Sequence, residues 1–223
     1  MANDYDRLRG QQERWFDLVY DTGTVEAIRL IPLNAQDAPG YSGGTSTGTV
    51  DMYLRRRAFR LEEDGELVLA VACLQRSNEI RFYRRRGYRR EDYYAFVRLL
   101  VRCGCVDAAR REKQKIDDFF GDYIDDTRTL TWSASLRSMP RRIRKERAAE
   151  MTAMRETWGR VVEDELVRTN RRREYEFIRK ELPDLCPKSQ SAYTRAKGTN
   201  SAKYQQIQAA VRARGLSFPE ELR

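Results

Sequence analysis

The chain has 223 residues, of which 40% are hydrophobic and 35% are charged, and it contains no histidine. Its length allows one or two domains with a sizeable core, and the missing imidazole excludes Ser-His-Asp catalysis, Cys-His catalysis and His-ligated zinc. The 43 basic residues outnumber the 34 acidic ones, which gives a formal net charge of +9 and favours a polyanionic partner.

The cysteines and the hydropathy predict a cytoplasmic protein. Cys73, Cys103, Cys105 and Cys186 have neither a disulfide-framework spacing nor the paired Cys-x-x-Cys knuckles of a zinc site. No apolar run approaches the roughly 20 residues of a membrane span, and the first residues lack a signal-peptide pattern. We therefore expect reduced thiols, no cofactor and no membrane partner.

The N-terminal part of the chain begins with a predicted helix. Asn3 or Asp4 can cap this helix, which should end near Tyr20. The short segment 25–31 has a period that leaves strand and helix open. Residues 34–49, rich in Gly, Ser and Thr, are predicted as a flexible loop, which we interpret as a connection rather than a functional lid.

The stretch after this loop allows two interpretations. Its apolar residues recur at helical intervals, yet they can also alternate as in a strand. A helix is favoured, and a small β-hairpin near 50–74 is the alternative. Beyond this stretch, Ser77 or Asn78 is predicted to cap a short helix that ends near Arg86.

Two further helices are predicted to complete the N-terminal domain, and a glycine marks the end of each. The first covers 90–103 and ends at Gly104, and the second begins at Val106 and ends near Gly121. We expect a mainly α-helical domain, with the β-hairpin as its alternative, over residues 1–136.

Residues 137–223 are predicted to form a basic helical domain. Residues 141–223 contain 20 basic and 12 acidic residues, so they carry +8 of the net +9. Pro140 favours the start of a helix, and 141–173 is the longest helix expected. We expect its apolar side to dock on the N-terminal core, with a homo-oligomer seam or another protein partner as the alternative.

Arginine outnumbers lysine by 36 to 7, and many arginines are clustered. A guanidinium group binds phosphate through two parallel donors, so these clusters predict contacts with nucleic acid. The predicted contact residues are Tyr83, Arg84, Arg85, Arg86, Tyr88 and Arg89, in a turn that interleaves aromatic and basic side chains, and Arg171, Arg172 and Arg173. In the alternative interpretation Phe82 and Tyr83 pack inward and the arginines of the turn pair with Glu79, Glu91 and Asp92.

Residues 189–214 have the pattern of a helix-turn-helix. Ser189 can cap a helix to Lys197, residues 198–200 form a turn, and Ser201 can cap a second helix that ends before Gly215. The positions predicted to face the core are Tyr193, Tyr204, Ile207 and Val211.

The second of these helices is the candidate for base recognition, because lysine suits guanine and glutamine suits adenine. The predicted nucleic-acid contacts are Lys197, Ser201, Lys203, Gln205 and Gln206. An ordinary helical hairpin is the alternative, because Lys197 and Thr199 stand where apolar residues would help the two helices to pack.

An acidic cluster interrupts the basic sequence at Asp117, Asp118, Asp122, Asp125 and Asp126. On an uninterrupted helix Asp118, Asp122 and Asp125 would share one face and could hold Mg²⁺. Gly121 counts against that helix, so a solvated acidic end is favoured and no metal site is predicted.

The sequence as a whole predicts an accessory protein that binds DNA or RNA in a regulatory, packaging or processing role, with arginine neutralising phosphates. One alternative is a structural component of a nucleoprotein particle or virion. The other is a Mg²⁺-dependent nuclease that uses the cluster 117–126. A non-enzymatic role is favoured.

Overall fold

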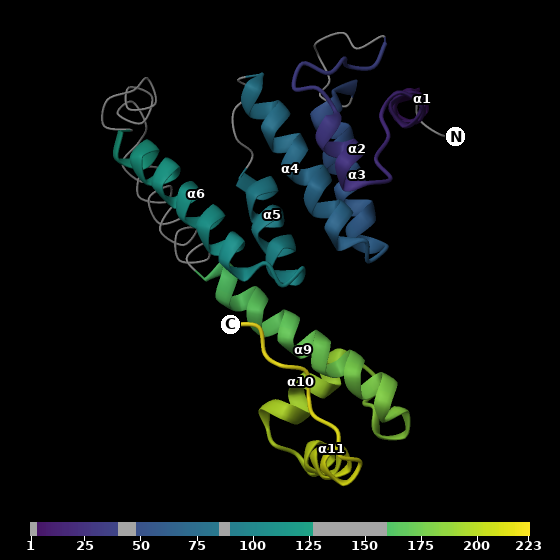
Figure 1. Cartoon of the computed structure of the whole chain (residues 1–223), viewed down its shortest axis with the longest axis vertical. Helices are drawn as coiled ribbons and strands as arrows, with labels where there is room; N and C mark the ends of the chain where they lie inside the picture. Colours follow the sequence, from purple (N-terminus) through teal and green to yellow (C-terminus); the bar gives the residue numbers. More distant parts are fainter. Residues whose placement is uncertain (1–3, 40–47, 85–89, 127–159) are drawn as a thin grey trace. The chain divides into compact units, whose positions relative to one another are not determined.

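The computed structural model describes residues 4–39, 48–84, 90–126 and 160–223, and most of them are helical (Figure 1). These residues contain no β-strand, which confirms the predicted mainly α-helical fold class. None of the helices within these ranges is long and apolar enough to cross a membrane.

The chain divides into two compact units, residues 1–130 and 131–223. The described helices of the first unit are α1 (Asp4–Val19), α2 (Val25–Leu30), α3 (Val50–Glu63), α4 (Leu67–Tyr83), α5 (Arg90–Arg102) and α6 (Val106–Asp126). Helix α3 packs on α1 and α4, α4 packs on α2 and α5, and α5 packs on α6. From α3 to α6, successive helices therefore lie side by side, whereas α1 packs on α3 and α2 packs on α4 (Figure 1).

The first helix agrees with its prediction. The segment after it, for which strand and helix were both open, forms helix α2. The Thr24 hydroxyl accepts a hydrogen bond from the Ala27 amide at 3.1 Å, which caps α2. Of the predicted loop 34–49, residues 40–47 lie outside the described part of the chain. Its two described ends are joined, because the Ala38 amide donates to the Gly48 carbonyl at 2.9 Å.

Helices α3 and α4 replace the alternative β-hairpin near 50–74, which is wrong. They are joined by a turn in which Gly65 adopts a φ of 84°, a left-handed conformation that glycine enters without strain. Ser77 and Asn78, the predicted caps of a short helix, are instead buried in the middle of α4. Because α2, α3 and α5 all cover α4, its buried residues lie on several sides and show no clear helical period.

The chain reverses between α5 and α6 at Gly104, which has a φ of 79°, so the predicted end of α5 is confirmed within one residue. Helix α6 continues through Gly121 to Asp126, and its predicted end near Gly121 is wrong. A glycine inside a helix costs only about 1 kcal/mol relative to alanine, which does not by itself end a helix of this length.

The arginines of the first unit are largely paired within it. The Glu13 carboxylate accepts hydrogen bonds from Arg56 at 2.7 Å and from Arg60 at 2.6 Å, which ties α1 to α3. Burial alone would raise the pKa of Glu13. The hydrogen bond from Arg60 and the positive charges of Arg56, Arg60 and Arg9 outweigh burial, so the pKa of Glu13 is lowered. Arg55 pairs with the buried Asp92 and so ties α3 to α5.

The described helices of the second unit are α9 (Val161–Glu181), the 3₁₀ turn η2 (Pro183–Leu185), α10 (Gln190–Gly198) and α11 (Ala202–Ala213). Of the predicted helix 141–173, the part before residue 160 lies outside the described residues. The described part continues eight residues past the predicted end and stops just before Pro183, which lacks the backbone donor that helix propagation needs.

Candidate nucleic-acid interface

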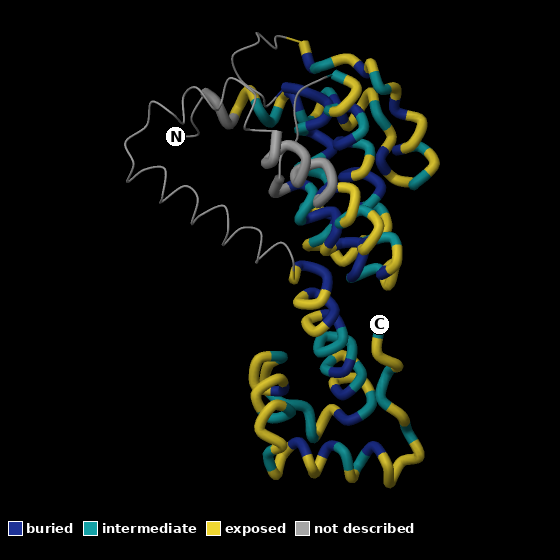
Figure 2. The backbone as a smooth tube through the Cα atoms, turned by 90° about the vertical axis from the view of Figure 1, so that its left-hand side faces the viewer, coloured by how far each residue is buried: buried dark blue, intermediate teal, exposed yellow. Residues whose placement is uncertain are grey.

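A buried cluster holds α10 and α11 on the C-terminal half of α9. Its fully or nearly fully buried members are Ile178, Leu182, Tyr193, Tyr204, Ile207 and Val211. The rings of Tyr193 and Tyr204 join α10 to α11 at a centroid distance of 6.0 Å. All four positions predicted to face inward are therefore confirmed, and buried and exposed positions alternate along α11, the helix at the bottom of Figure 2.

The two helices begin at the serines that the sequence predicted as caps. The Ser189 hydroxyl accepts from the Ala192 amide at 3.2 Å, and the Ser201 hydroxyl accepts from the Tyr204 amide at 3.4 Å. Between them Asn200 adopts a φ of 47°, a left-handed conformation that asparagine tolerates better than most residues. Its carbonyl also accepts from the side-chain Nε2 atom of Gln205 at 3.2 Å, which ties the turn to α11.

A buried carboxylate joins α9 to α10. Glu174 is 5% exposed and accepts hydrogen bonds from the Tyr193 hydroxyl at 3.0 Å and from the Lys197 ammonium at 2.5 Å. Burial, followed by the neighbouring Glu174 carboxylate, raises the pKa of Tyr193, so its hydroxyl stays protonated. Lys197, one of the predicted nucleic-acid contacts, thus has its charge paired inside the unit.

The arginines predicted on α9 are half-buried beside the C-terminal tail of the chain. Arg173 donates to the Glu220 carbonyl at 2.8 Å, and the Nη1 atom of Arg171 is buried without a hydrogen-bond partner. One turn earlier Asn170 exchanges two hydrogen bonds with the Leu222 backbone, at 2.9 and 3.0 Å. The contacts of Arg173 and Asn170 with the tail favour a structural role for Arg173, and no such contact is described for Arg171 or Arg172.

The solvent face of α11 carries the remaining predicted contacts. Lys203, Gln205 and Gln206 are exposed, and Ser201 is half-buried as the cap. The other exposed positions of this helix are Ala202, Ala209, Arg212 and Ala213. Small alanines between polar side chains leave room for the helix to approach a partner closely.

The distribution of acids along the chain also marks this surface, because residues 185–219 contain no Asp or Glu. The basic residues in that interval are Lys188, Arg195, Lys197, Lys203, Arg212 and Arg214. All of them except Lys197 are exposed, and Arg214 also donates to the Glu181 carbonyl at 2.7 Å. Counting acids along the chain would have identified Lys188, Arg195, Arg212 and Arg214.

The aromatic-basic turn of the first unit is only partly described. Tyr83 is 57% exposed, so it does not pack inward. Arg84 pairs with Asp37 at 2.7 Å and donates to the Ala35 carbonyl. The other predicted contacts in this turn, Arg85, Arg86, Tyr88 and Arg89, lie outside the described residues.

Two of the three partners expected for this turn are engaged elsewhere, and the side chain of the third, Glu91, lies outside the described part of the structure. Glu79 pairs with Arg76 at 2.6 Å, and Asp92 pairs with Arg55. Arg84 therefore pairs within the unit, as the alternative interpretation expected, but its partner is Asp37, which that interpretation did not name.

The backbone of α6 continues through Gly121, which is the condition set for Asp118, Asp122 and Asp125 to share a helix face. The side chains of residues 117–126 lie outside the described part of the structure. Where side chains are described, no three His, Cys, Asp or Glu residues come together to hold a metal ion.

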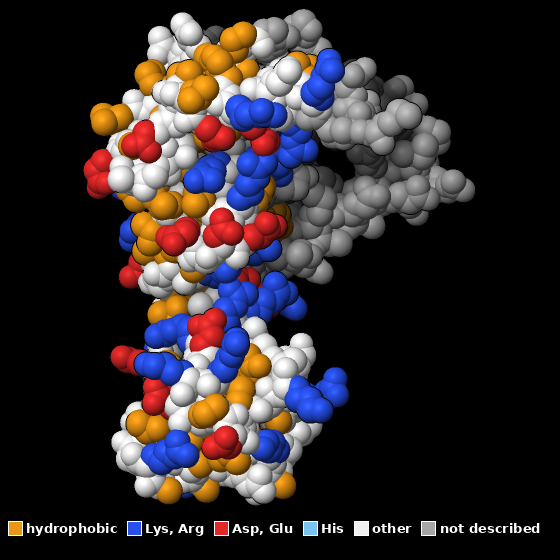
Figure 3. All heavy atoms as spheres, turned by 90° about the vertical axis from the view of Figure 1, so that its right-hand side faces the viewer, with side chains coloured by type: hydrophobic (Ala, Val, Ile, Leu, Met, Phe, Trp, Pro, Cys, Tyr) orange, Lys and Arg blue, Asp and Glu red, His pale blue; other side chains and the backbone are white. Residues whose placement is uncertain are grey.

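Figure 3 compares the charges of the two units on one face of the molecule. Acidic and basic side chains are interspersed over the first unit, and Lys and Arg predominate over the second. Comparison of the chain with protein-family models, curated proteins and solved structures finds no match.

Proposed function

We propose that the chain is a nucleic-acid-binding accessory protein that contacts DNA or RNA with α11 and the surface beside it. The observation that carries this proposal is the acid-free interval 185–219, whose exposed lysines and arginines lie on a framework held by a buried cluster. A polyanion approaching this surface meets several cations and no competing carboxylate from the interval itself. Such a surface gains affinity by neutralising phosphates and releasing counterions.

The residues of this surface divide into two groups by their chemistry. Arg195, Arg212 and Lys203 are exposed cations suited to phosphate oxygens, which set affinity and orientation. Gln206 presents a side-chain amide that suits the edge of adenine, and Gln205 offers the same group once its Nε2 atom releases the Asn200 carbonyl. Their place near the start of α11 matches the way in which a recognition helix presents its first turns to base edges.

The test is a salt titration of the full chain with duplex DNA, single-stranded DNA and RNA of equal length. We expect binding at low salt and a linear fall of log affinity with log salt concentration, with a slope of about −3 or steeper on duplex DNA if three or more phosphates are neutralised. The polymer with the highest affinity identifies the preferred partner. Absence of binding to all three at low salt would contradict the proposal.

A further inference from the structure

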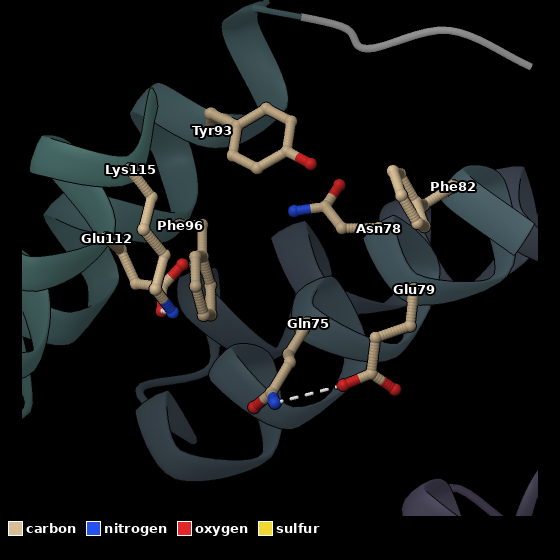
Figure 4. Close-up of a pocket in the computed structure, with 8 residues that line it drawn as sticks. All are labelled: Gln75, Asn78, Glu79, Phe82, Tyr93, Phe96, Glu112 and Lys115. Carbon is tan, nitrogen blue, oxygen red and sulfur yellow. Dashed lines mark hydrogen bonds and ion pairs between the residues drawn. The ribbon is translucent and has the colours of Figure 1, made fainter. Parts of the chain in front are cut away.

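A cavity of about 320 Å³ opens between α4, α5 and α6 of the first unit (Figure 4). Its volume lies at the lower end of the range of about 300 to 1,000 Å³ that is usual for small-molecule sites. The cavity thus has room for a compact ligand.

One buried polar atom at this cavity has no partner within the part of the chain that the structure describes. Asn78 lies in the middle of α4 and is 9% exposed, and its Nδ2 atom makes no hydrogen bond. Figure 4 shows its amide projecting into the space between the other lining side chains. Buried amide donors are nearly always paired, so this one calls for an acceptor supplied from within the cavity.

Aromatic rings surround the Asn78 amide. Tyr93 and Phe96 approach it from α5, and Phe82 approaches from its own helix (Figure 4). Phe96 is 7% exposed, whereas Phe82 is 66% exposed and stands at the open side. Ring faces beside an amide suit a flat heterocycle, which can stack on the rings and pair its edge with the amide.

The charged groups of the lining already have partners. The Glu79 carboxylate accepts from Gln75 at 3.0 Å and from Arg76 at 2.6 Å. The Lys115 ammonium donates to Glu112 at 2.7 Å. The lining thus offers two carboxylates and one lysine that is already paired, which disfavours a ligand carrying phosphate and favours an uncharged one.

We propose that this cavity binds the base of an uncharged nucleoside, with its edge on Asn78 and its face against the aromatic rings. Adenine is the best match, because it presents a donor and an acceptor side by side, as an amide requires. The ligand is a free nucleoside rather than a nucleotide of a strand, because a strand carries the phosphates that the lining disfavours. This site is independent of the α10–α11 surface and does not rest on it.

The test is a calorimetric titration of the full chain with adenosine, with indole as a ligand of the same ring sizes that lacks a ring acceptor. We expect adenosine to bind at least about tenfold more tightly than indole, because only adenosine pairs with the Asn78 donor. We expect AMP to bind more weakly than adenosine. No adenosine binding at about 10 mM, a concentration that reveals even millimolar affinity, would overturn the proposal. An affinity for indole or for AMP equal to that for adenosine would also overturn the proposal.

Two variants locate the binding and guard against a folding defect. Asn78→Leu keeps the side-chain size and removes the unpaired donor, so we expect an equal or higher Tm and an affinity for adenosine at least about tenfold lower. Phe82→Ala removes a mostly exposed ring, and we expect weaker binding with little change in Tm. Val68→Ala, at an exposed apolar position of α4 outside the lining, should change neither the affinity for adenosine nor the Tm. Unchanged adenosine affinity in both cavity variants would place the ligand elsewhere and reject the site.

Two further measurements test the preference for an uncharged ligand and distinguish the cavity from the α11 surface. A short single-stranded oligodeoxyadenylate carries phosphates and should not displace adenosine, and displacement would contradict the preference for an uncharged nucleoside. Lys203→Ala, on α11, should leave adenosine affinity unchanged. Loss of adenosine affinity in that variant would contradict the cavity assignment without bearing on nucleic-acid binding by α11.

Discussion

The two units use similar basic side chains in opposite ways. In the first unit, Arg55, Arg56 and Arg84 each reach a carboxylate on another segment of the chain, and these ion pairs hold helices together. In the second unit, 35 consecutive residues, 185–219, contain no carboxylate, and most of their cations are exposed. The distribution of acids therefore separates structural arginines from those available to a polyanion better than arginine clustering does.

Lys197 and Arg173 show that the second unit also has structural cations. Lys197 reaches back to Glu174 on α9, and Arg173 reaches a carbonyl of the C-terminal tail. Both contacts join segments that are far apart in the sequence. Among the described residues, Lys203 and Arg212 on the outer face of α11 make no such cross-link. This difference is why we propose them, rather than Lys197 or Arg173, as contacts for a partner.

The largest expected effect concerns the framework of the second unit. Ile207→Ala empties a fully buried position between α9, α10 and α11, and we expect a loss of about 2 to 5 kcal/mol in the free energy of unfolding. Gln206→Ala, at the adjacent exposed position, is the control and should change stability by less than about 0.5 kcal/mol. Denaturant unfolding followed by circular dichroism measures both. Equal stability of the two variants would mean that the cluster does not hold α11.

Glu13→Gln tests the ion pairs of the first unit. Removing a carboxylate that accepts from Arg56 and Arg60 should cost about 1 to 3 kcal/mol at neutral pH, whereas the exposed Glu63→Gln should cost little. The pKa of Glu13 is lowered below its ordinary 4.5, so its stabilisation is complete above that value and is lost as the pH falls through the lowered pKa. The difference between wild type and variant should therefore shrink below about pH 4.5. A difference that does not depend on pH would show that packing, not charge, holds α1 on α3.

Base recognition by α11 predicts an effect that depends on sequence. Lys203→Ala and Gln206→Ala should each cost about 1 to 3 kcal/mol on a preferred sequence, found by selection from a random pool, and much less on unrelated sequences. Competition binding at fixed salt measures the ratio of the affinities for the preferred and the unrelated sequences. An equal loss on all sequences would make α11 a phosphate contact only.

The smallest expected effect on binding concerns Arg84. Its guanidinium is held by Asp37 and by the Ala35 carbonyl, so Arg84→Gln should leave the slope of log affinity against log salt unchanged. A modest loss of stability, of about 1 to 2 kcal/mol, should accompany the change. A slope that flattens by about one unit would instead place Arg84 on a phosphate.

Features set by neighbouring residues were predictable from the sequence. Ser189 and Ser201 could be identified as caps because a cap is a contact over three residues. Tyr204, Ile207 and Val211 could be placed in the core because their spacing of three and four keeps them on one side of a helix. These local signals were enough to predict both helices and the buried face of α11.

Features set by distant contacts were not predictable in the same way. The sequence predicts a helix start at Ser77 or Asn78 because these residues resemble caps, but both lie in the middle of α4. Only the packing of α2, α3 and α5 around α4 explains polar residues at buried positions. Arg84 was expected at a surface because its partner Asp37 lies 47 residues away. The cavity at Asn78 depends on three helices and has no signature in any one segment.

The central claim is that the exposed cations around α11, rather than arginine in general, bind nucleic acid. The most direct test compares two triple variants that remove the same charge, both measured with the full chain on duplex DNA over a range of salt concentrations. Arg195, Lys203 and Arg212 are changed to Gln in one, and the exposed Arg98, Arg110 and Arg111 of the first unit are changed to Gln in the other.

We expect the first variant to flatten the slope of log affinity against log salt by about two to three units and the second to leave it nearly unchanged. Neither should alter folding appreciably, because exposed cations contribute little to stability. Equal flattening in both variants would mean that net charge alone governs binding. Flattening only in the second would place the interface on the first unit, and either result would contradict the account.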